Sequence, residues 1–276
     1  MVRLYSEVLG RPVEVPDSPE RIVSLSPALT EILYMLGLEE RIAGVSIFCH
    51  KPPEAGRKPK VGSYFKVMYS KLEGLDPDLI LVTTGAQLRI VGELVEKGYT
   101  VYPIPLPVSM SGVIDQVIQV GIVTGRLSEA RGLAYRLMEK LLSLRGALSG
   151  VKLYYEVFLG GPETFGAHTY LADAMHIMGA RTPFQDERTT WVSNPSPEAI
   201  VKFDPDVILY ERSPYSKITL EWVLRDFEGR GLGGLRALRE GRILLLEPDT
   251  LAHYGPSLID DLARIVDDVK RLLSTG

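Results

Sequence analysis

The segment SEARGLAYRLMEKLLSLRGAL, residues 128–148, predicts the longest uninterrupted helix before the carboxyl terminus. Its leucines recur at helical spacing and form one apolar stripe, which Ala134, Met138 and Leu144 widen. Its composition is rich in residues that favour helix. At a rise of 1.5 Å per residue, a helix of ~20 residues is roughly 30 Å long. We interpret this segment as a strut that joins two lobes.

The residues before this helix alternate between strand and helix patterns. A β-hairpin is predicted over residues 3–15, and Ser26-Pro27 opens a helix that ends at Gly37. Further strands are predicted over 21–25, 42–47, 79–83 and 100–104, with a helix over 88–97. Strand–helix–strand units in series are typical of a parallel sheet.

The residues after the helix repeat the same turn signals. Asp204-Pro205-Asp206 echoes Asp76-Pro77-Asp78, REGRIL (239–244) echoes EKGYTV (96–101), and a helix over 171–178 ends at Gly179 as another ends at Gly37. Such echoes arise by chance in α/β proteins, but three in one order favour a duplicated lobe. The sequence predicts an α/β fold of two similar lobes with central, mostly parallel sheets. Its parts are lobe 1–127, helix 128–148 and lobe 149–276, which ends in an amphipathic helix over 256–273.

Composition excludes several classes of protein. The net charge is −4 without a basic block, so nucleic acid is not an expected partner. A single cysteine, Cys49, excludes an internal disulfide framework. No apolar run approaches the ~18 residues that span a bilayer, and the amino terminus lacks the pattern of a secretory leader. Either a leader has been removed or the protein is made without one. Nothing suggests an obligate oligomer, so we predict a monomer.

The candidate binding site is a cleft between the lobes. Ligands of open α/β sheets bind beyond the carboxyl ends of the strands, and clefts between domains are preferred sites. Large aromatic residues on such loops suit a flat, partly apolar ligand, although each one could instead pack against its own lobe. The ligand-binding candidates are Phe48, His50, Tyr64, Thr84, His168, Trp191, Arg212, His253 and Tyr254.

Three of the four histidines (His50, His168 and His253) fall on these loops, whereas His176 lies inside a helix and is predicted to be structural. A three-histidine metal site is conceivable, but no pair has the spacing of a metalloenzyme motif. We therefore predict no permanent metal site. The loop histidines are expected either to contact a metal-bearing ligand or to be solvated. Nucleophile-elbow, Walker A and dinucleotide motifs are also missing from the sequence, so neither enzyme activity nor an intrinsic cofactor is expected.

Several segments together resemble a known family. They are RPVEVPDSPERIVSLSPALTEILYMLGLEERIAGVS (11–46), KPPEAGRKPKVGSY (51–64), LEGLDPDLILV (72–82) and the helix 128–148. This set is similar to the substrate-binding proteins of ABC importers with a rigid interdomain helix, which take up cobalamin, ferric siderophores and haem. The PPEA…PKVG run looks most like the vitamin B12-binding branch. The resemblance implies that the mature domain begins near residue 3 after removal of a leader, hence a periplasmic or cell-surface location. A chain made without a leader would be cytoplasmic.

The resemblance also implies roles for particular residues. The family's aromatic ligand contacts fall on Tyr64, where the cobalamin binder has tryptophan, on Trp191, where the type matches, and near Phe48. The family's arginine in the last loop is replaced by His253, an imidazole that suits a corrin, a haem or a siderophore.

The family docks on its permease through one glutamate per lobe. Glu198 fits in the second lobe, but Ser70 occupies the matching position of the first, with Glu73 one turn on. The expected function is capture of a large metal-bearing ligand, a corrinoid first, for delivery to an ABC permease. The alternatives are a ferric-siderophore or haem receptor, a leaderless cytosolic metal-handling protein or metalloenzyme, and a leaderless carrier that has lost docking.

Overall fold

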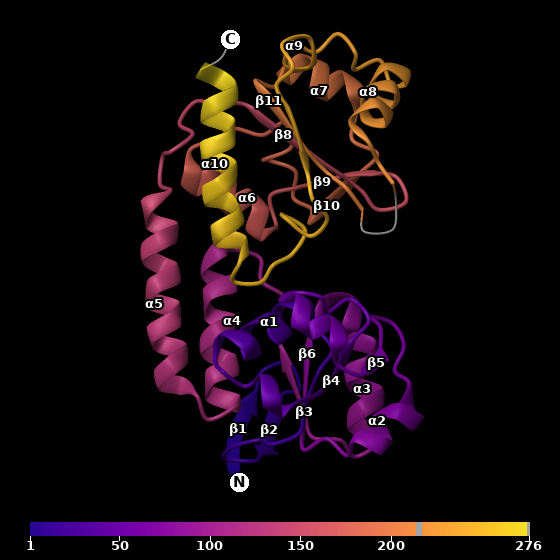
Figure 1. Cartoon of the computed structure of the whole chain (residues 1–276), viewed down its shortest axis with the longest axis vertical. Helices are drawn as coiled ribbons and strands as arrows, with labels where there is room; N and C mark the ends of the chain where they lie inside the picture. The colour runs from indigo at the N-terminus through magenta and orange to yellow at the C-terminus, as the bar shows by residue number, and fades with distance from the viewer. Residues whose placement is uncertain (214–216, 275–276) are drawn as a thin grey trace. The chain divides into compact units, whose positions relative to one another are not determined.

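The computed structural model describes residues 1–213 and 217–274 and divides into two compact units (Figure 1). The first comprises Met1–Pro107 and Ser111–Met138, and the second Val108–Met110 and Glu139–Gly276. Each is built on a five-stranded, mostly parallel sheet with helices packed on it, which confirms the predicted fold class. In the described part of the chain no helix is both long and apolar enough to cross a membrane.

The first sheet is entirely parallel, with strand order β5-β4-β3-β6-β7. Beside it lies a separate antiparallel hairpin, β1–β2, where the sequence predicts one. The elements are β1 (Val2–Ser6), β2 (Arg11–Val15), β3 (Ile22–Ser24), α1 (Pro27–Met35), η1 (Glu39–Arg41), β4 (Ile42–Ser46), η2 (Pro53–Arg57), β5 (Lys60–Gly62), α2 (Tyr69–Leu75), β6 (Leu79–Thr83), η3 (Gly85–Gln87), α3 (Leu88–Glu96) and β7 (Val101–Ile104).

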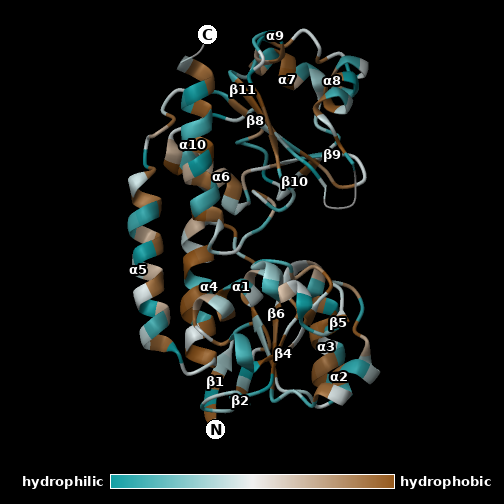
Figure 2. Cartoon of the chain, viewed as in Figure 1, coloured by the Kyte–Doolittle hydropathy of each residue, from teal (hydrophilic) through white to brown (hydrophobic). Residues whose placement is uncertain are grey.

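The core of the first unit lies between the sheet and its helices. Every residue of β3 and β6 is buried, as expected for parallel strands covered on both faces. Helix α3 packs Ile90, Val91 and Leu94 against Ile80 and Val82 of the sheet. Figure 2 shows the same division, with apolar strands inside and helices that carry polar residues on their outer sides.

Two long helices, α4 (Met110–Val123) and α5 (Leu127–Ser143), form a hairpin (Figure 1). They approach closely at Gly121, where a Cβ atom would collide with the Cβ of Ala130. The sequence does not predict α4. Helix α5 lies where a helix is predicted over 128–148 but ends five residues early, because the chain turns through Gly146 at positive φ (69°). Met138, predicted to widen the apolar stripe, is exposed.

The second sheet has the strand order β10-β9-β8-β11-β12. Strands β8, β11 and β12 are parallel, whereas β9 and β10 are antiparallel additions at one edge. Trp191, predicted to lie in a loop, is the first residue of β10. The elements are β8 (Leu153–Phe158), β9 (Pro162–Phe165), α6 (Tyr170–Met178), β10 (Trp191–Ser193), α7 (Pro197–Phe203), β11 (Val207–Glu211), α8 (Leu220–Gly229), α9 (Arg236–Arg239), β12 (Ile243–Leu246) and α10 (Leu258–Ser274).

The repeated Asp-Pro-Asp motif has one structure in both units. Asp76 ends α2 and Asp204 ends α7, and both adopt the left-handed backbone conformation (φ 45° and 47°). Aspartate tolerates this conformation better than most residues, and the proline that follows cannot donate a backbone hydrogen bond to extend the helix. The motif therefore stops a helix and turns the chain into the next strand.

The second aspartate of each motif holds the start of the neighbouring strand. The carboxylate of Asp78 accepts hydrogen bonds from the backbone N–H of Glu20 (2.7 Å) and Arg21 (3.1 Å), just before β3. The carboxylate of Asp206 accepts one from the N–H of Lys152 (2.8 Å), just before β8. Because β6 pairs with β3 as β11 pairs with β8, the two halves share a strand-anchoring device, not only a similar sequence.

Candidate functional site

In the first unit, two predicted aromatic residues lie against each other. Phe48 follows β4 and Tyr64 follows β5, and their ring centroids are 4.5 Å apart with the rings tilted by 30°. Phe65 packs edge-on against Tyr64, with 6.4 Å between centroids. Strands β4 and β5 are parallel neighbours, so the residues that follow them emerge at the same edge of the sheet. These three residues form what we call the aromatic cluster.

Large apolar side chains are exposed at this same edge. Phe65 is 72% exposed, Ile47 after β4 is 50% exposed, and Leu88, which begins α3 after β6, is 54% exposed. Exposed apolar side chains gathered near one edge are typical of a binding surface. The sequence analysis did not select these three residues. Their position in the sequence could have identified them, because Ile47, Phe65 and Leu88 each lie next to or a few residues after a predicted ligand-binding residue.

The two polar candidates of the first unit have different surroundings. His50 is exposed on the segment after β4. The hydroxyl of Thr84 accepts a hydrogen bond from the N–H of Leu106 (2.9 Å) and so ties the loop after β6 to the one after β7. Nearby, the buried Gln87 side chain donates to the carbonyl of Leu25 (2.7 Å) and accepts from the hydroxyl of Thr83 (2.7 Å). Thr84 therefore helps to hold the loops in place.

In the second unit, His168 and Trp191 lie on adjoining backbone segments. The N–H of His168 donates to the carbonyl of Thr189 (3.0 Å), and Trp191 pairs with Phe165 at the end of β9. His168 is exposed and Trp191 is half-buried. Strand β9 runs antiparallel to β8. Its last residue, Phe165, and the paired Trp191 therefore lie away from the end of the sheet at which the loops after β11 and β12 emerge.

The last loop, residues 250–254, contacts the first turn of α6. The hydroxyl of Tyr170 donates to the carbonyl of Leu251 (2.9 Å), and the rings of Tyr170 and Tyr254 are 6.1 Å apart. His253 stacks on Tyr254 with 6.5 Å between centroids and is only 5% exposed. The structure thus brings the predicted His253 and Tyr254 together beside α6, with the His253 side chain buried.

Arg212 follows β11 and forms an ion pair with Glu247, which follows β12. Its side chain is partly exposed, while its Nε atom is buried without a hydrogen-bond partner among the described residues. The ion pair joins two neighbouring parallel strands at their carboxyl ends. Arg212 therefore has a structural contact in addition to its proposed role toward a ligand.

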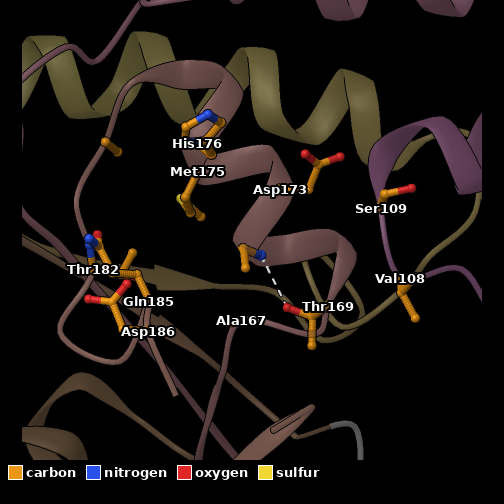
Figure 3. Close-up of a pocket in the computed structure, with 12 residues that line it drawn as sticks. Val108, Ser109, Ala167, Thr169, Asp173, Met175, His176, Thr182, Gln185 and Asp186 are labelled. Atoms are coloured by element: carbon orange, nitrogen blue, oxygen red, sulfur yellow. Dashed lines mark hydrogen bonds between the residues drawn. The ribbon is translucent and has the colours of Figure 1, made fainter. Parts of the chain in front are cut away.

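A polar cavity of about 390 Å³ lies along one side of α6 (Figure 3). Asp173 stands at its rim and accepts a hydrogen bond from the N–H of Met110 (2.6 Å) at the start of α4. His176 lines the cavity and is exposed, which corrects its prediction as a structural residue. None of the nine predicted ligand-binding residues lines this cavity, although Ala167 and Thr169 on either side of His168 do.

The two candidate docking residues lie on matching helices. Glu198 is exposed in the first turn of α7, where the hydroxyl of Ser196 donates to its carboxylate (2.7 Å) and helps to lower its pKa. Glu73 is exposed on α2. Aligned by the Asp-Pro-Asp motif that ends both helices, Ser70 and Glu198 each stand six residues before the first aspartate. The two glutamates therefore do not occupy equivalent positions.

Residues 22–250 match the model of the family described as "Periplasmic binding protein". The chain belongs to this family. The match confirms the resemblance to the substrate-binding proteins of ABC importers, and the family is one of transport binding proteins and not of enzymes. Among residues 1–213 and 217–274, the chain contains no group of three or more His, Cys, Asp or Glu residues arranged to hold a metal ion.

Three proteins are similar to this chain in sequence or in fold. An uncharacterised ABC transporter substrate-binding lipoprotein from Bacillus subtilis is 27% identical over 93% of this chain and 82% of its own length. A cobalamin-binding protein from Halobacterium salinarum is 28% identical over 92% of this chain and 70% of its own length. A periplasmic heme-binding protein from Roseiflexus, solved in the apo form, has a TM-score of 0.79 at 22% identity and covers 92% of this chain and 98% of its own. The last comparison shows a shared fold alone.

Proposed function

We propose that this chain is the extracytoplasmic substrate-binding component of an ABC importer and that it captures a corrinoid for delivery to the permease. The observation that carries the proposal is the aromatic cluster of Phe48, Tyr64 and Phe65 at the carboxyl edge of the first sheet. Phe65 is exposed and Phe48 and Tyr64 are half-buried, and such planar rings offer apolar area at low entropic cost. The similarity to a cobalamin-binding protein over 92% of the chain favours a corrinoid among flat ligands.

We assign further ligand contacts to residues of the second unit. Trp191 and Tyr254 supply further aromatic area, while His168, Arg212 and His253 supply donors and acceptors for the amide edges of a corrinoid. Aromatic side chains give affinity through apolar burial at about 25 cal/mol per Å². A few fixed polar groups give orientation. We assign His50 and Thr84 to the same role in the first unit.

Titration with cyanocobalamin, haemin and a ferric siderophore tests the assignment. We expect saturable binding of cyanocobalamin by the wild-type protein. Tyr64→Ala and Phe65→Ala should each weaken that binding roughly 10- to 100-fold, since burial of one large apolar side chain contributes about 1.5–3 kcal/mol. Tyr5→Ala is the matched control, because Tyr5 is an exposed aromatic residue on β1. If none of the three ligands binds saturably, the proposed function is wrong.

A ferric-siderophore or haem receptor is the second candidate. It is favoured by His253, whose ring stacks on Tyr254 in the loop where the resemblance places an arginine. The same titrations separate the two candidates. Under this second hypothesis, Trp191→Ala leaves corrinoid binding unchanged and His253→Ala abolishes binding of the iron ligand. Stoichiometric zinc or iron in freshly purified protein, without an organic chelator, would instead favour a metal-handling protein or metalloenzyme.

Docking on the permease is proposed to depend mainly on Glu198. Its pKa is lowered and it is exposed, so it presents a full negative charge to basic residues of a partner. Glu73 is assigned the weaker role in the first unit. In vesicles that contain the cognate permease, Glu198→Gln should reduce ligand uptake several-fold without changing ligand affinity in solution. Ser70→Ala is the control at the equivalent position, and equal uptake by all three proteins would contradict the assignment.

A further inference from the structure

One fully buried carboxylate has no part in the function proposed above. Glu211 is the last residue of β11, and its side chain has no exposed surface. A second buried glutamate, Glu156, lies on the neighbouring strand β8, and there two bonds from the guanidinium of Arg230 (2.6 and 3.0 Å) balance the charge. Glu211, in contrast, receives its hydrogen bonds from uncharged donors. A buried charge held in this way is costly unless it has a structural task.

The donors to Glu211 identify that task. Its Oε2 atom accepts from the N–H of Leu251 (2.7 Å), the N–H of Ala252 (3.1 Å) and the hydroxyl of Tyr155 (3.1 Å). Its Oε1 atom accepts from the N–H of Ala252 at 3.2 Å. Two consecutive amide groups of the last loop are thus bound to the end of a central strand. These are the residues directly before His253 and Tyr254.

The loop is held from its other side at the same residue. Leu251 is fully buried, and its carbonyl accepts the hydrogen bond from Tyr170 on α6. The backbone at Leu251 is therefore fixed between β11 and α6, and the two rings that follow take their position from it. When Glu211 is ionised, the bonds from Leu251 and Ala252 to its carboxylate are stronger than bonds to a neutral acceptor.

We propose that Glu211 is a positioning residue that fixes the loop 250–254 for ligand binding, and that gain of a proton by its carboxylate, with Glu211 itself still buried, loosens this loop and weakens ligand binding. The predicted effect on ligand binding rests on the proposed function, whereas the predicted effect on the loop does not. A protonated carboxyl keeps only one full acceptor oxygen for three donors and loses the charge that strengthens those bonds.

The surroundings of Glu211 place the gain of this proton near neutral pH. Burial raises the pKa of Glu211 to about 7, although the bonds from Leu251 and Ala252 act in the opposite direction. The titratable groups that face it are Tyr155 on β8, Tyr170 on α6 and Asp249 in the preceding turn, and the negative charge of Asp249 raises the pKa further. Arg212, the next residue, is engaged with Glu247.

Hydrogen exchange of the full-length protein tests the predicted effect on the loop without any ligand. After correction for intrinsic exchange rates, protection of the Leu251 and Ala252 amides should fall about tenfold between pH 8 and pH 6 in the wild type, the loss expected when a charge-assisted bond becomes a neutral one. Glu211→Gln should remove the pH dependence, and Glu211→Leu should lower protection at every pH. Glu163→Gln, a glutamate on β9 of the same sheet, is the control and should behave as the wild type.

Cyanocobalamin affinity over the same pH range tests the predicted effect on ligand binding. We expect wild-type affinity to fall several-fold from pH 8 to pH 6 and the affinity of Glu211→Gln to stay constant. Protection that does not change with pH in the wild type would overturn the inference, even if Glu211→Leu fails to fold. If protection of the loop amides changes with pH but cyanocobalamin affinity does not, the predicted effect on ligand binding is wrong. Absence of any binding at pH 8 would contradict the proposed function, and hydrogen exchange would then decide the role of Glu211 by itself.

Discussion

Replacement of Arg230 by methionine is expected to lower the free energy of unfolding by about 3–5 kcal/mol. The guanidinium donates to both carboxylate oxygens of Glu156, whose side chain is fully buried, and also to Asp226 (2.8 Å). Burial raises the pKa of Glu156, and the bonds from Arg230 offset part of that effect. Without the arginine, Glu156 has to bury an unpaired charge or take up a proton.

Denaturation in urea at pH 7 measures this loss. Arg225→Met is the matched control, because Arg225 is exposed on helix α8, and Arg230 directly follows that helix as its C-cap. The loss for Arg230→Met should shrink as the pH falls, since a protonated Glu156 no longer needs a cation. The double variant Arg230→Met/Glu156→Gln should recover much of the stability, because it removes the buried charge along with its partner. A loss below about 1 kcal/mol would mean that the pair contributes no more than a surface ion pair.

Glu211→Gln is expected to change how stability depends on pH. The pKa of Glu211 is about 7 in the folded protein, above the ordinary value of 4.5, so the folded state binds more protons between these values. Wild-type stability should therefore fall as the pH rises through this window. A permanently neutral side chain is free of this effect. Relative to the wild type, Glu211→Gln should gain about 2–3 kcal/mol in stability between pH 5 and pH 8.

Urea midpoints of both proteins at pH 5, 6, 7 and 8 provide the measurement. Only the difference between the proteins matters, because other groups titrate equally in both. Glu163→Gln should show a constant difference from the wild type. If the gap between Glu211→Gln and the wild type stays constant from pH 5 to pH 8, the buried carboxylate titrates outside this window and the explanation fails.

Local sequence signals predicted the framework of the fold well. Asp-Pro-Asp, Ser26-Pro27 and the glycines after helices act through the conformations of a few consecutive residues, and such signals can be read without tertiary structure. Helix α4 was missed because half of its fourteen residues are valine or isoleucine and two are glycine, a composition with low helix propensity. The helix packs closely on α5 at Gly121, a tertiary contact that local propensity does not report.

The candidate site was less predictable than the framework. The contact between Phe48 and Tyr64 depends on the pairing of β4 with β5, a strand of three residues that carries no clear signal of its own. The edge strands β9 and β10 are separated by α6, so their antiparallel pairing, which places Trp191, is a long-range property. Burial of His253 depends on contacts from other elements, which residue type and spacing do not report.

The two Asp-Pro-Asp turns bear on how such a protein changes its specificity. Each compresses a helix stop, a chain reversal and a strand clamp into three consecutive residues, so an insertion there would dislocate a sheet. The opposite end of each sheet carries candidate ligand contacts: the aromatic cluster in the first unit, and in the second the 250–254 loop, in which Leu251 and His253 are buried. Under the proposed function, one end of each sheet preserves the scaffold, and side chains exposed at the other end can change with the ligand.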